Sequence, residues 1–385
     1  MRPNHQHFEF DPGIRVIFGE NAIDRLGELA SEFGHRALLV TDPGIVKAGH
    51  VARASAALRK AAIASIVFQE VAENPTTRHV ENGVRFDRQH QPIDVIIALG
   101  GGSVMDCAKG INFILTNGGK MEDYWGFGKA QKPMLPSIGI PTTAGTGSEA
   151  QSFALISYAE THEKMACGDK KARFRTVILD PTLVKSVPRK VAAIAGMDAI
   201  SHAIESYVCT KRNPISQMFA REAWRLLSTN YEVVLHDSED LEVWGHMLLG
   251  AHFAGLAIEN SMLGAAHACA NPLAAHYGIT HGIAVGIMLP HVIRFNGETV
   301  NGYYKDLVAE AGLGLGRSSS CADTLATRIS ELQRIGELPQ QLRALRVDNK
   351  IFPQLAKEAA QQWTGAFNPC PVSEADFLEL YKIAY

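Results

Sequence analysis

The chain has 385 residues, a formal net charge of −3, 46% hydrophobic residues and 20% charged residues. This apolar content is typical of a folded globular protein and excludes a disordered chain. The small net charge and the lack of a Lys/Arg-rich run argue against nucleic acid as a partner. Because one hydrophobic core usually stops growing below this length, we expect two domains.

The compartment is indicated by the start of the chain and by its cysteines. The opening residues MRPNHQHFEFDPG lack the apolar segment of a leader, and no uninterrupted apolar run approaches the roughly 18 residues of a membrane helix. The six cysteines are scattered without a CxxC pair, which argues against a disulfide framework and a structural zinc site. We therefore expect a cytoplasmic protein with reduced cysteines and no membrane partner.

Short apolar runs alternate with helical stretches from the start of the chain to about residue 188. The runs are RVIFG at 15–19, ALLVTD at 37–42, SIVFQEV at 65–71, DVIIALG at 94–100 and SIGIP at 137–141. Such runs, separated by helices, indicate parallel strands buried on both faces. We predict a doubly wound, mostly parallel, Rossmann-like α/β domain over residues 1–187.

Helical patterns replace the strand signal in the second half of the chain. They are most regular over 196–209, 216–235 and 241–262. Segments of this length with apolar residues at helical spacing indicate packed helices rather than strands. We predict an all-α domain over residues 188–385.

A glycine-rich turn follows the strand predicted at 94–100. Gly100, Gly101, Gly102 and Ser103 lead into a helix that is expected to begin near Val104. Glycines at such a turn let the backbone approach a diphosphate, which then faces free N–H groups and the positive end of the helix. A dinucleotide site is one interpretation, and a simple closure of the βα corner is the other.

Two further strand ends carry groups that could bind a nucleotide. The run PTTAGTGSE, which follows the strand at 137–141, offers the hydroxyls of Thr142, Thr143 and Thr146 where ligands of open sheets bind. Asp42 closes the strand at 37–42, where a carboxylate could bind the adenosine ribose and repel a 2′-phosphate, which favours NAD over NADP. The alternative is that the sequence Asp-Pro-Gly at 42–44 forms only a turn.

Four side chains in the second half have the spacing of ligands of one divalent metal. Asp198 and His202 are four residues apart and are expected on one face of a helix, and His267 and His281 could complete the set. Three nitrogens and one oxygen suit Fe(II) or Zn(II), and such an ion acts as a Lewis acid that lowers the pKa of a bound alcohol. Spacing alone also allows a helix-capping Asp198 and three histidines of the core.

The chain resembles the iron-containing (group III) alcohol dehydrogenases, which include lactaldehyde reductase and 1,3-propanediol dehydrogenase. The resemblance spans nearly the whole chain and is carried, in the family's order, by VTDPGIVKAG, ALGGGSVMDCAKGI, IPTTAGTGSE, AGMDAISHAIESY, AGLAIENSMLGAAHA and HGIAVGIMLPHVIRFN. It implies a dehydroquinate synthase-like architecture, NAD(H) as cofactor and a divalent metal, which is Fe(II) in most members and Zn(II) in some. It also implies a homo-oligomer, as a dimer or larger.

The resemblance implies roles for individual residues. The two turns would hold the dinucleotide through Gly101, Gly102, Ser103, Asp106, Thr142, Thr143 and Thr146. Asp42 and Asn74 match positions on the adenosine and nicotinamide sides of the cofactor, and Lys164 matches a lysine at the nicotinamide ribose. The metal ligands of the family fall on Asp198, His202, His267 and His281, which are also the expected catalytic positions.

One expected catalytic position departs from the family. Many relatives carry a second histidine, assigned to proton transfer, four residues after the third ligand, where this chain has Asn271. An amide can hydrogen-bond substrate or ribose but cannot exchange a proton at neutral pH. The relay would then run through another group, and the candidates are the nicotinamide ribose hydroxyl, His276 and water.

These features together predict a metal-dependent oxidoreductase. We expect reversible hydride transfer between NAD and a small primary alcohol or diol, as in an alcohol dehydrogenase or aldehyde reductase. One alternative is a non-redox, metal- and NAD-binding lyase of the dehydroquinate synthase type, although that family resembles a different ligand pattern with Glu. Another is a degenerate sensor or binding relative. The sequence does not specify the alcohol, the native metal or the direction of the reaction.

Overall fold

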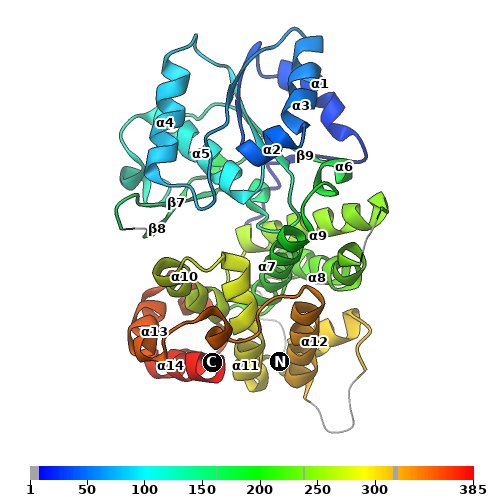
Figure 1. Ribbon diagram of the computed structural model, residues 1–385, viewed down its shortest axis with the longest axis vertical. Coiled ribbons are helices and arrows are strands. Elements are labelled where there is room, and N and C mark those ends of the chain that lie inside the picture. Colours follow the sequence, from blue (N-terminus) through cyan, green and yellow to red (C-terminus); the bar gives the residue numbers. More distant parts are fainter. Residues whose placement is uncertain (1–7, 162, 237–238, 315–319) are drawn as a thin grey trace. The chain divides into compact units, whose positions relative to one another are not determined.

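The protein is described by a computed structural model over residues 8–161, 163–236, 239–314 and 320–385. The chain forms two compact units (Figure 1). One consists of Pro12–Val187 and Glu239–Leu248, and the other of the residues before Pro12, Pro188–Ser238 and Leu249–Tyr385. Part of the opening segment, on which the expected lack of a leader depends, lies outside the described residues.

The first unit contains a six-stranded sheet in which the strands run parallel. Its spatial order is β1 (Arg15–Phe18), β9 (Thr176–Leu179), β6 (Ser137–Pro141), β4 (Val95–Gly100), β2 (Arg36–Val40) and β3 (Ala64–Phe68). Every residue of β4 and β6 is buried, which explains why these strands are apolar throughout. The predicted doubly wound α/β fold is confirmed, and each of the five predicted runs contains a strand.

The strand order reverses between β2 and β4. From β2 the chain proceeds to β3 at one edge, and from β4 it proceeds through β6 to β9 in the opposite direction. In open α/β sheets, ligands bind outside the carboxyl ends of the strands at such a reversal. Asp42 follows β2 and Gly101 follows β4, so both positions flank this point.

Helices cover both faces of the six-stranded sheet. Helices η1 (Ala22–Arg25), α1 (Leu26–Ser31) and α3 (His50–Lys60) share a core with residues of β2, β4 and β6. Helices α4 (Thr77–Arg88) and α5 (Gly102–Asn117) lie together on the other side in Figure 1. The shorter helices of this unit are α2 (Pro43–Lys47), α6 (Pro181–Val184), η2 (Met121–Tyr124), η3 (Ser148–Ala150) and η4 (Lys170–Ala172).

A second, three-stranded sheet in the α/β unit was not predicted from the sequence. Its order is β5 (Gly126–Phe127), β8 (Lys164–Gly168) and β7 (Phe153–Ser157), and β7 pairs antiparallel with β8. Strands β7 and β8 are only alternately buried and contain Ala and Gly, so their apolar pattern is weak. Strands β7 and β8 follow the threonine-rich turn after β6 in the chain.

The second unit is helical over its described residues, as predicted. Its helices are α7 (Arg189–Val208), α8 (Pro214–Leu235), α10 (Ala265–Tyr277), α11 (His281–Glu310), α12 (Cys321–Ile335), α13 (Phe352–Gln361), α14 (Glu374–Ile383), η5 (Leu342–Leu345), η6 (Asn349–Ile351) and η7 (Trp363–Phe367). Helix α7 packs against α8 and α11, and α11 also packs against α10 and α12. Because α7 is buried almost all round, the side chains that it shares with α10 and α11 are held inside the unit.

Helix α9 (Leu241–Glu259) contributes residues up to Leu248 to the α/β unit and its remainder to the helical unit. Among the described residues it is the one helix long and apolar enough to cross a membrane, with a mean hydropathy of 1.2. Of that window, 61% is buried inside the protein, and core helices of globular proteins pass the same test.

Candidate active site

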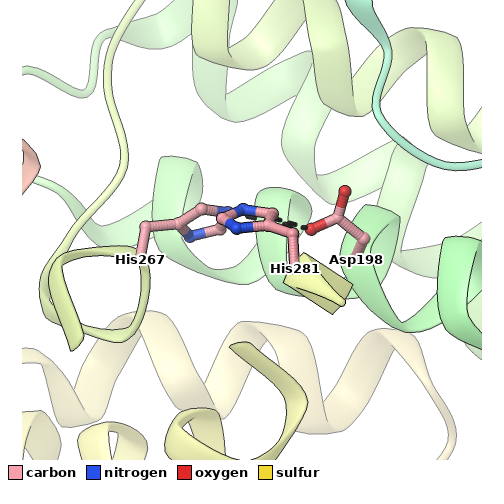
Figure 2. Close-up of side chains that lie close together, drawn as sticks. All are labelled: Asp198, His267 and His281. Atoms are coloured by element: carbon pink, nitrogen blue, oxygen red, sulfur yellow. Dashed lines mark ion pairs between the residues drawn. The ribbon is translucent and has the colours of Figure 1, made fainter. Parts of the chain in front are cut away.

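Three imidazoles of the helical unit approach one carboxylate oxygen of a fourth residue, Asp198. The Nε2 atoms of His202, His267 and His281 lie 3.6, 3.9 and 3.8 Å from Oδ1 of Asp198. Figure 2 shows the carboxylate of Asp198 facing the rings of His267 and His281, and the ligand atoms of these three residues all lie within 4.8 Å of one another. The structure therefore brings Asp198, His267 and His281 together, with His202 beside Asp198 but outside this group of mutually close ligand atoms. The role of all four as ligands is still a prediction.

Three helices position these side chains. Asp198 and His202 lie one turn apart on α7, His267 lies in the first turn of α10, and His281 is the first residue of α11. Gly282 lets α11 begin close against α7, because a Cβ at this position would lie 2.5 Å from the carbonyl oxygen of Ile194. Only glycine permits this approach. It places His281 beside Asp198.

The cluster is buried on one side and accessible on the other. Asp198 and His202 are each 5% exposed and His267 is 3% exposed, whereas the side chain of His281 is 26% exposed. A buried carboxylate is costly unless it is paired or coordinates a metal. A cation at the shared oxygen would compensate this carboxylate, and the half-buried His281 is the most accessible of the four side chains.

Glu205 is a residue of this cluster that the sequence interpretation missed. Its Oε2 lies 2.6 Å from Nδ1 of His267, and its side chain is buried. It lies on α7, three residues after His202, so the i, i+4, i+7 spacing of Asp198, His202 and Glu205 was the available signal. Because a carboxylate at Nδ1 favours the proton on that nitrogen, Nε2 is left with its lone pair toward Asp198.

The donor set fits a divalent ion. Nε2 of His267 is buried and makes no hydrogen bond within the described part of the chain. Buried polar atoms are normally satisfied, so this atom requires a partner that the protein does not supply. One carboxylate and three imidazoles are suitable ligands of Fe(II) and Zn(II).

Asn271 lies on α10, one turn after His267. Its Nδ2 donates a hydrogen bond of 2.9 Å to Oε1 of Gln362. His276, a candidate for the proton relay, lies on the same helix with Nε2 2.8 Å from Oε2 of Glu358. Both side chains are thus engaged with residues near or on α13, and a direct role of either in proton transfer is still a prediction.

The two turns of the α/β unit meet at the carboxyl ends of neighbouring strands. Gly100 and Pro141 are paired in register, and the backbone N–H of Thr142 donates to the carbonyl oxygen of Gly100 at 3.0 Å. A Cβ at Gly102 would lie 2.5 Å from Oγ1 of Thr146, so the absence of a side chain lets the turns approach each other. Oγ1 of Thr142 is buried and makes no hydrogen bond within the described residues, which fits a hydroxyl that awaits a ligand.

Asp106 lies in a buried polar cluster behind these turns. Ser148 Oγ donates to Oδ1 of Asp106 at 2.6 Å, and Nζ of Lys109 donates to the carbonyl oxygens of Ser148 and Phe153, each at 2.7 Å. Burial raises the pKa of the Asp106 carboxyl, and the charges of Lys109 and Lys164 oppose this rise. Within this structure Asp106 joins α5 to the second turn, and its contact with a cofactor is still a prediction.

The other expected cofactor residues occupy turns and a strand end in the same unit. Asp42 caps α2, because its Oδ1 accepts from the N–H groups of Gly44 and Ile45 at 2.8 and 3.1 Å. The alternative interpretation was a turn over 42–44, but the structure has the N-cap and the first two residues of α2 there, and a ribose contact of Asp42 is still a prediction. Asn74 has a φ of 52° and its N–H donates to Oγ of Ser103 at 3.3 Å, next to the glycine turn.

The remaining expected cofactor residues lie near these turns. Lys164 is the first residue of β8 and lies near enough to Asp106 for its charge to act on that carboxylate. Thr143 is near Gly101, where an added Cβ would be 3.4 Å from its Oγ1. The α/β unit thus contains all the predicted cofactor residues, and most of them follow the carboxyl ends of β2, β4 and β6.

Comparison with known proteins identifies the family. A model of iron-containing alcohol dehydrogenases matches residues 13–181, and a model of the C-terminal part of the Fe-containing alcohol dehydrogenase family matches residues 192–385. The 1,3-propanediol dehydrogenase of Citrobacter freundii is 33% identical over 375 residues, which cover 96% of each chain. The chain belongs to the iron-containing alcohol dehydrogenase family. As a member, it is an NAD-dependent oxidoreductase that acts on alcohols or aldehydes.

Solved structures of iron-containing alcohol dehydrogenases share the fold over the whole chain. A crystal structure of 1,3-propanediol oxidoreductase matches with a TM-score of 0.95 and 32% identity, over 99% of this chain and 100% of that chain. The sulfoacetaldehyde reductase of Bifidobacterium kashiwanohense in complex with NAD+ matches with a TM-score of 0.89 and 26% identity, over 98% and 99%. The predicted family resemblance is therefore confirmed.

Proposed function

We propose that the protein transfers hydride reversibly between NAD and a small primary alcohol or diol, with a divalent metal bound by Asp198, His202, His267 and His281. Fe(II) is the proposed ion and Zn(II) is the alternative. The observation that carries the proposal is the convergence of three Nε2 atoms within 3.6–3.9 Å of one carboxylate oxygen. A structural histidine cluster would instead satisfy its nitrogens within the protein, whereas Nε2 of His267 makes no hydrogen bond among the described residues.

The chemistry of this reaction is divided among the bound groups and the side chains. A divalent ion at the cluster would polarise the alcohol or carbonyl oxygen, and the nicotinamide would accept or donate the hydride. Asp198 supplies the negative charge that neutralises part of the ion's charge, and the imidazoles supply neutral donors. The exposed side chain of His281 marks the side from which a small substrate could enter.

The α/β unit supports binding of a dinucleotide. The N-terminus of α5 follows directly on the glycine turn, so free N–H groups of its first turn could donate to a phosphate of the cofactor. The buried hydroxyl of Thr142 offers a further hydrogen bond. The location of Asp42 after β2 supports a preference for NAD over NADP, because its carboxylate would repel a 2′-phosphate.

The proposal is tested with pure protein loaded anaerobically with Fe(II) or, separately, Zn(II). NAD or NADH is added with a panel of primary alcohols, diols, aldehydes and anionic aldehydes, and the absorbance of the reduced nicotinamide is followed. We expect metal-dependent turnover of at least one short alcohol and its aldehyde, and loss of turnover after chelation. Metal and NADH binding without oxidation or reduction of any member would contradict the proposed reaction.

The assembly and location of the protein are also proposals. We infer a homo-oligomer, a dimer or larger, on the basis of the family, and sedimentation velocity on the metal-loaded protein would measure it. A cytoplasmic location is supported by the six free cysteines, five of which are buried, because free thiols are typical of reducing compartments. Fractionation of cells that produce the protein would test the location.

A further inference from the structure

We propose that Glu205 is a positioning residue that fixes the tautomer and orientation of His267 and anchors the first turn of α10. This inference rests on the proposed metal site, and it assigns a role to a residue outside the four ligands. Glu205 is 4% exposed and lies on α7, whereas His267 lies on α10, 62 residues later. The side chain therefore joins the two helices that carry three of the four proposed ligands.

Three donors surround the Glu205 carboxylate. Oε1 accepts from the N–H of Ala266 at 2.8 Å, and Oε2 accepts from the N–H of Gly264 at 3.1 Å and lies 2.6 Å from Nδ1 of His267. Backbone N–H groups can only donate, and an ionised carboxylate can only accept. The third contact is therefore satisfied when Nδ1 of His267 carries the proton.

The same contacts locate the imidazole in space. A histidine that donates from Nδ1 presents an unprotonated Nε2, which is the form that binds a metal. In this protein that Nε2 lies 3.9 Å from Oδ1 of Asp198. Because Glu205 also bonds two N–H groups of the turn that carries His267, it orients the backbone and the ring together.

A neighbouring residue provides a matched control. Oδ1 of Asn368 accepts from the N–H of Ala265 at 3.2 Å, so Asn368 also binds the first turn of α10. It is buried, and its side chain also exchanges hydrogen bonds with Asn296 and donates to the carbonyl oxygen of Cys370. Asn368 thus shares the anchoring role with Glu205, but within the described residues its side chain makes no hydrogen bond with His267.

The substitution Glu205→Gln separates the two roles. An amide keeps one accepting oxygen and replaces the other with an NH₂ group, so the three donors can no longer all be accepted. Where the NH₂ group replaces Oε2 it faces Nδ1 of His267, which is the one neighbour that can become an acceptor. The proton of His267 would then move to Nε2, which removes its lone pair from the metal site. Asn368→Ala removes a bond to the same turn without this effect on the tautomer.

The first measurement reads the tautomer in the metal-free wild-type protein, and a variant serves only to assign the signals. Heteronuclear NMR of the imidazole nitrogens, with the His267 signals assigned by their loss in His267→Gln, reports which nitrogen is protonated. We expect the Nδ1–H tautomer. A predominant Nε2–H tautomer would overturn the proposal.

The second measurement is Zn(II) affinity by competition with a chromophoric chelator. We expect Glu205→Gln to weaken Zn(II) binding by about 10–100-fold, the usual effect of losing a partner of a ligating histidine, and Asn368→Ala to change it no more than a few-fold. Equal affinities of wild type and Glu205→Gln would overturn the positioning role. If wild type bound neither Zn(II) nor Fe(II) while His267 kept its Nδ1 proton, the proposed metal function would fail and the role of Glu205 in fixing the tautomer would stand.

Discussion

Glu205 and Asp198 show what a local pattern can and cannot predict for a single residue. The spacing of Asp198 and His202 was sufficient to place both on one face of a helix, because that spacing depends only on helix geometry. The meeting of His267 with Glu205 depends on how α10 packs against α7, which no local pattern encodes. The ligand set was therefore anticipated through the family resemblance, and the positioning residue was recognised only in the structure.

Asn271 allows a prediction about proton transfer. Replacement by histidine would introduce an imidazole with an ordinary pKa of about 6.5, one turn after His267. We expect the variant to show an additional ionisation in the pH profile of kcat/KM between about pH 5.5 and 7.5, which the wild type lacks at this position. Steady-state kinetics of the metal-loaded enzyme across this range would measure it.

The control for this prediction is Asn271→Gln, which keeps an amide and introduces no titratable group. It separates the loss of the hydrogen bond to Gln362 from the effect of a new imidazole. Superimposable profiles of wild type and Asn271→His would show that residue 271 takes no part in proton transfer.

At the scale of elements, burial explains some of the predicted strands but not all of them. Strands β4 and β6 are buried throughout and gave uninterrupted apolar runs. Strands β7 and β8 include partly buried positions and gave no such run. Strand β9 is buried throughout and was missed, whereas the equally short and mostly exposed β1 was predicted. The long helices α7 and α8 were predictable because their apolar positions repeat over several turns.

The glycine turn before α5 allows a test with two neighbouring substitutions. Gly102→Ala would place a Cβ 2.5 Å from Oγ1 and 2.9 Å from Cβ of Thr146, so one of the two turns must move. We expect a loss of about 1–3 kcal/mol in the free energy of unfolding, as for other overpacked sites. If the movement of the turns also weakens the binding free energy of NADH by about 1.4 kcal/mol, the Kd for NADH rises about tenfold.

Gly101→Ala is the matched control for stability. Its Cβ would meet Oγ1 of Thr143 at 3.4 Å, an ordinary contact, and its φ of −79° is open to any residue. Urea unfolding and fluorescence titration with NADH would measure both variants. Equal stabilities of Gly101→Ala and Gly102→Ala would mean that the approach of Gly102 to Thr146 does not constrain the turns.

His291 on α11 allows a prediction of stability against pH. Burial, helped by the nearby charge of Arg294, lowers the pKa of His291 to about 4. The unfolded chain, with an ordinary pKa of about 6.5, binds a proton first as the pH falls. Proton binding by the unfolded chain therefore lowers the free energy of unfolding. This loss of stability is absent above about pH 6.5, grows as the pH falls toward 4, and is constant below it.

We expect this loss in the free energy of unfolding to be about 2 kcal/mol. It is smaller than the full pKa shift of His291 would give, because the side chain is partly exposed. His291→Gln removes the titrating group, so its free energy of unfolding should decline less than that of wild type between about pH 6.5 and 4. Urea unfolding at several pH values would measure the difference. Parallel declines in the two proteins would show that His291 does not cause the pH dependence.

For the whole molecule, each proposed site is contained in one compact unit. The glycine and threonine turns belong to the unit that includes Pro12–Val187, and the four proposed metal ligands belong to the helical unit. We propose residues 1–187 and 188–385 as the two domains. Composition and length indicated their number, and the change from strand to helical pattern indicated where they divide.

This separation leads to a prediction for His267→Ala. The substitution removes one proposed ligand from the helical unit and changes nothing in the turns that are proposed to hold NADH. We expect the variant to lose metal after gel filtration and to lose turnover, while its Kd for NADH stays within a few-fold of the wild-type value. Metal analysis together with fluorescence titration would measure both quantities on the same sample. Loss of metal and NADH binding together, in a variant that unfolds with wild-type cooperativity, would show that the two sites are not independent.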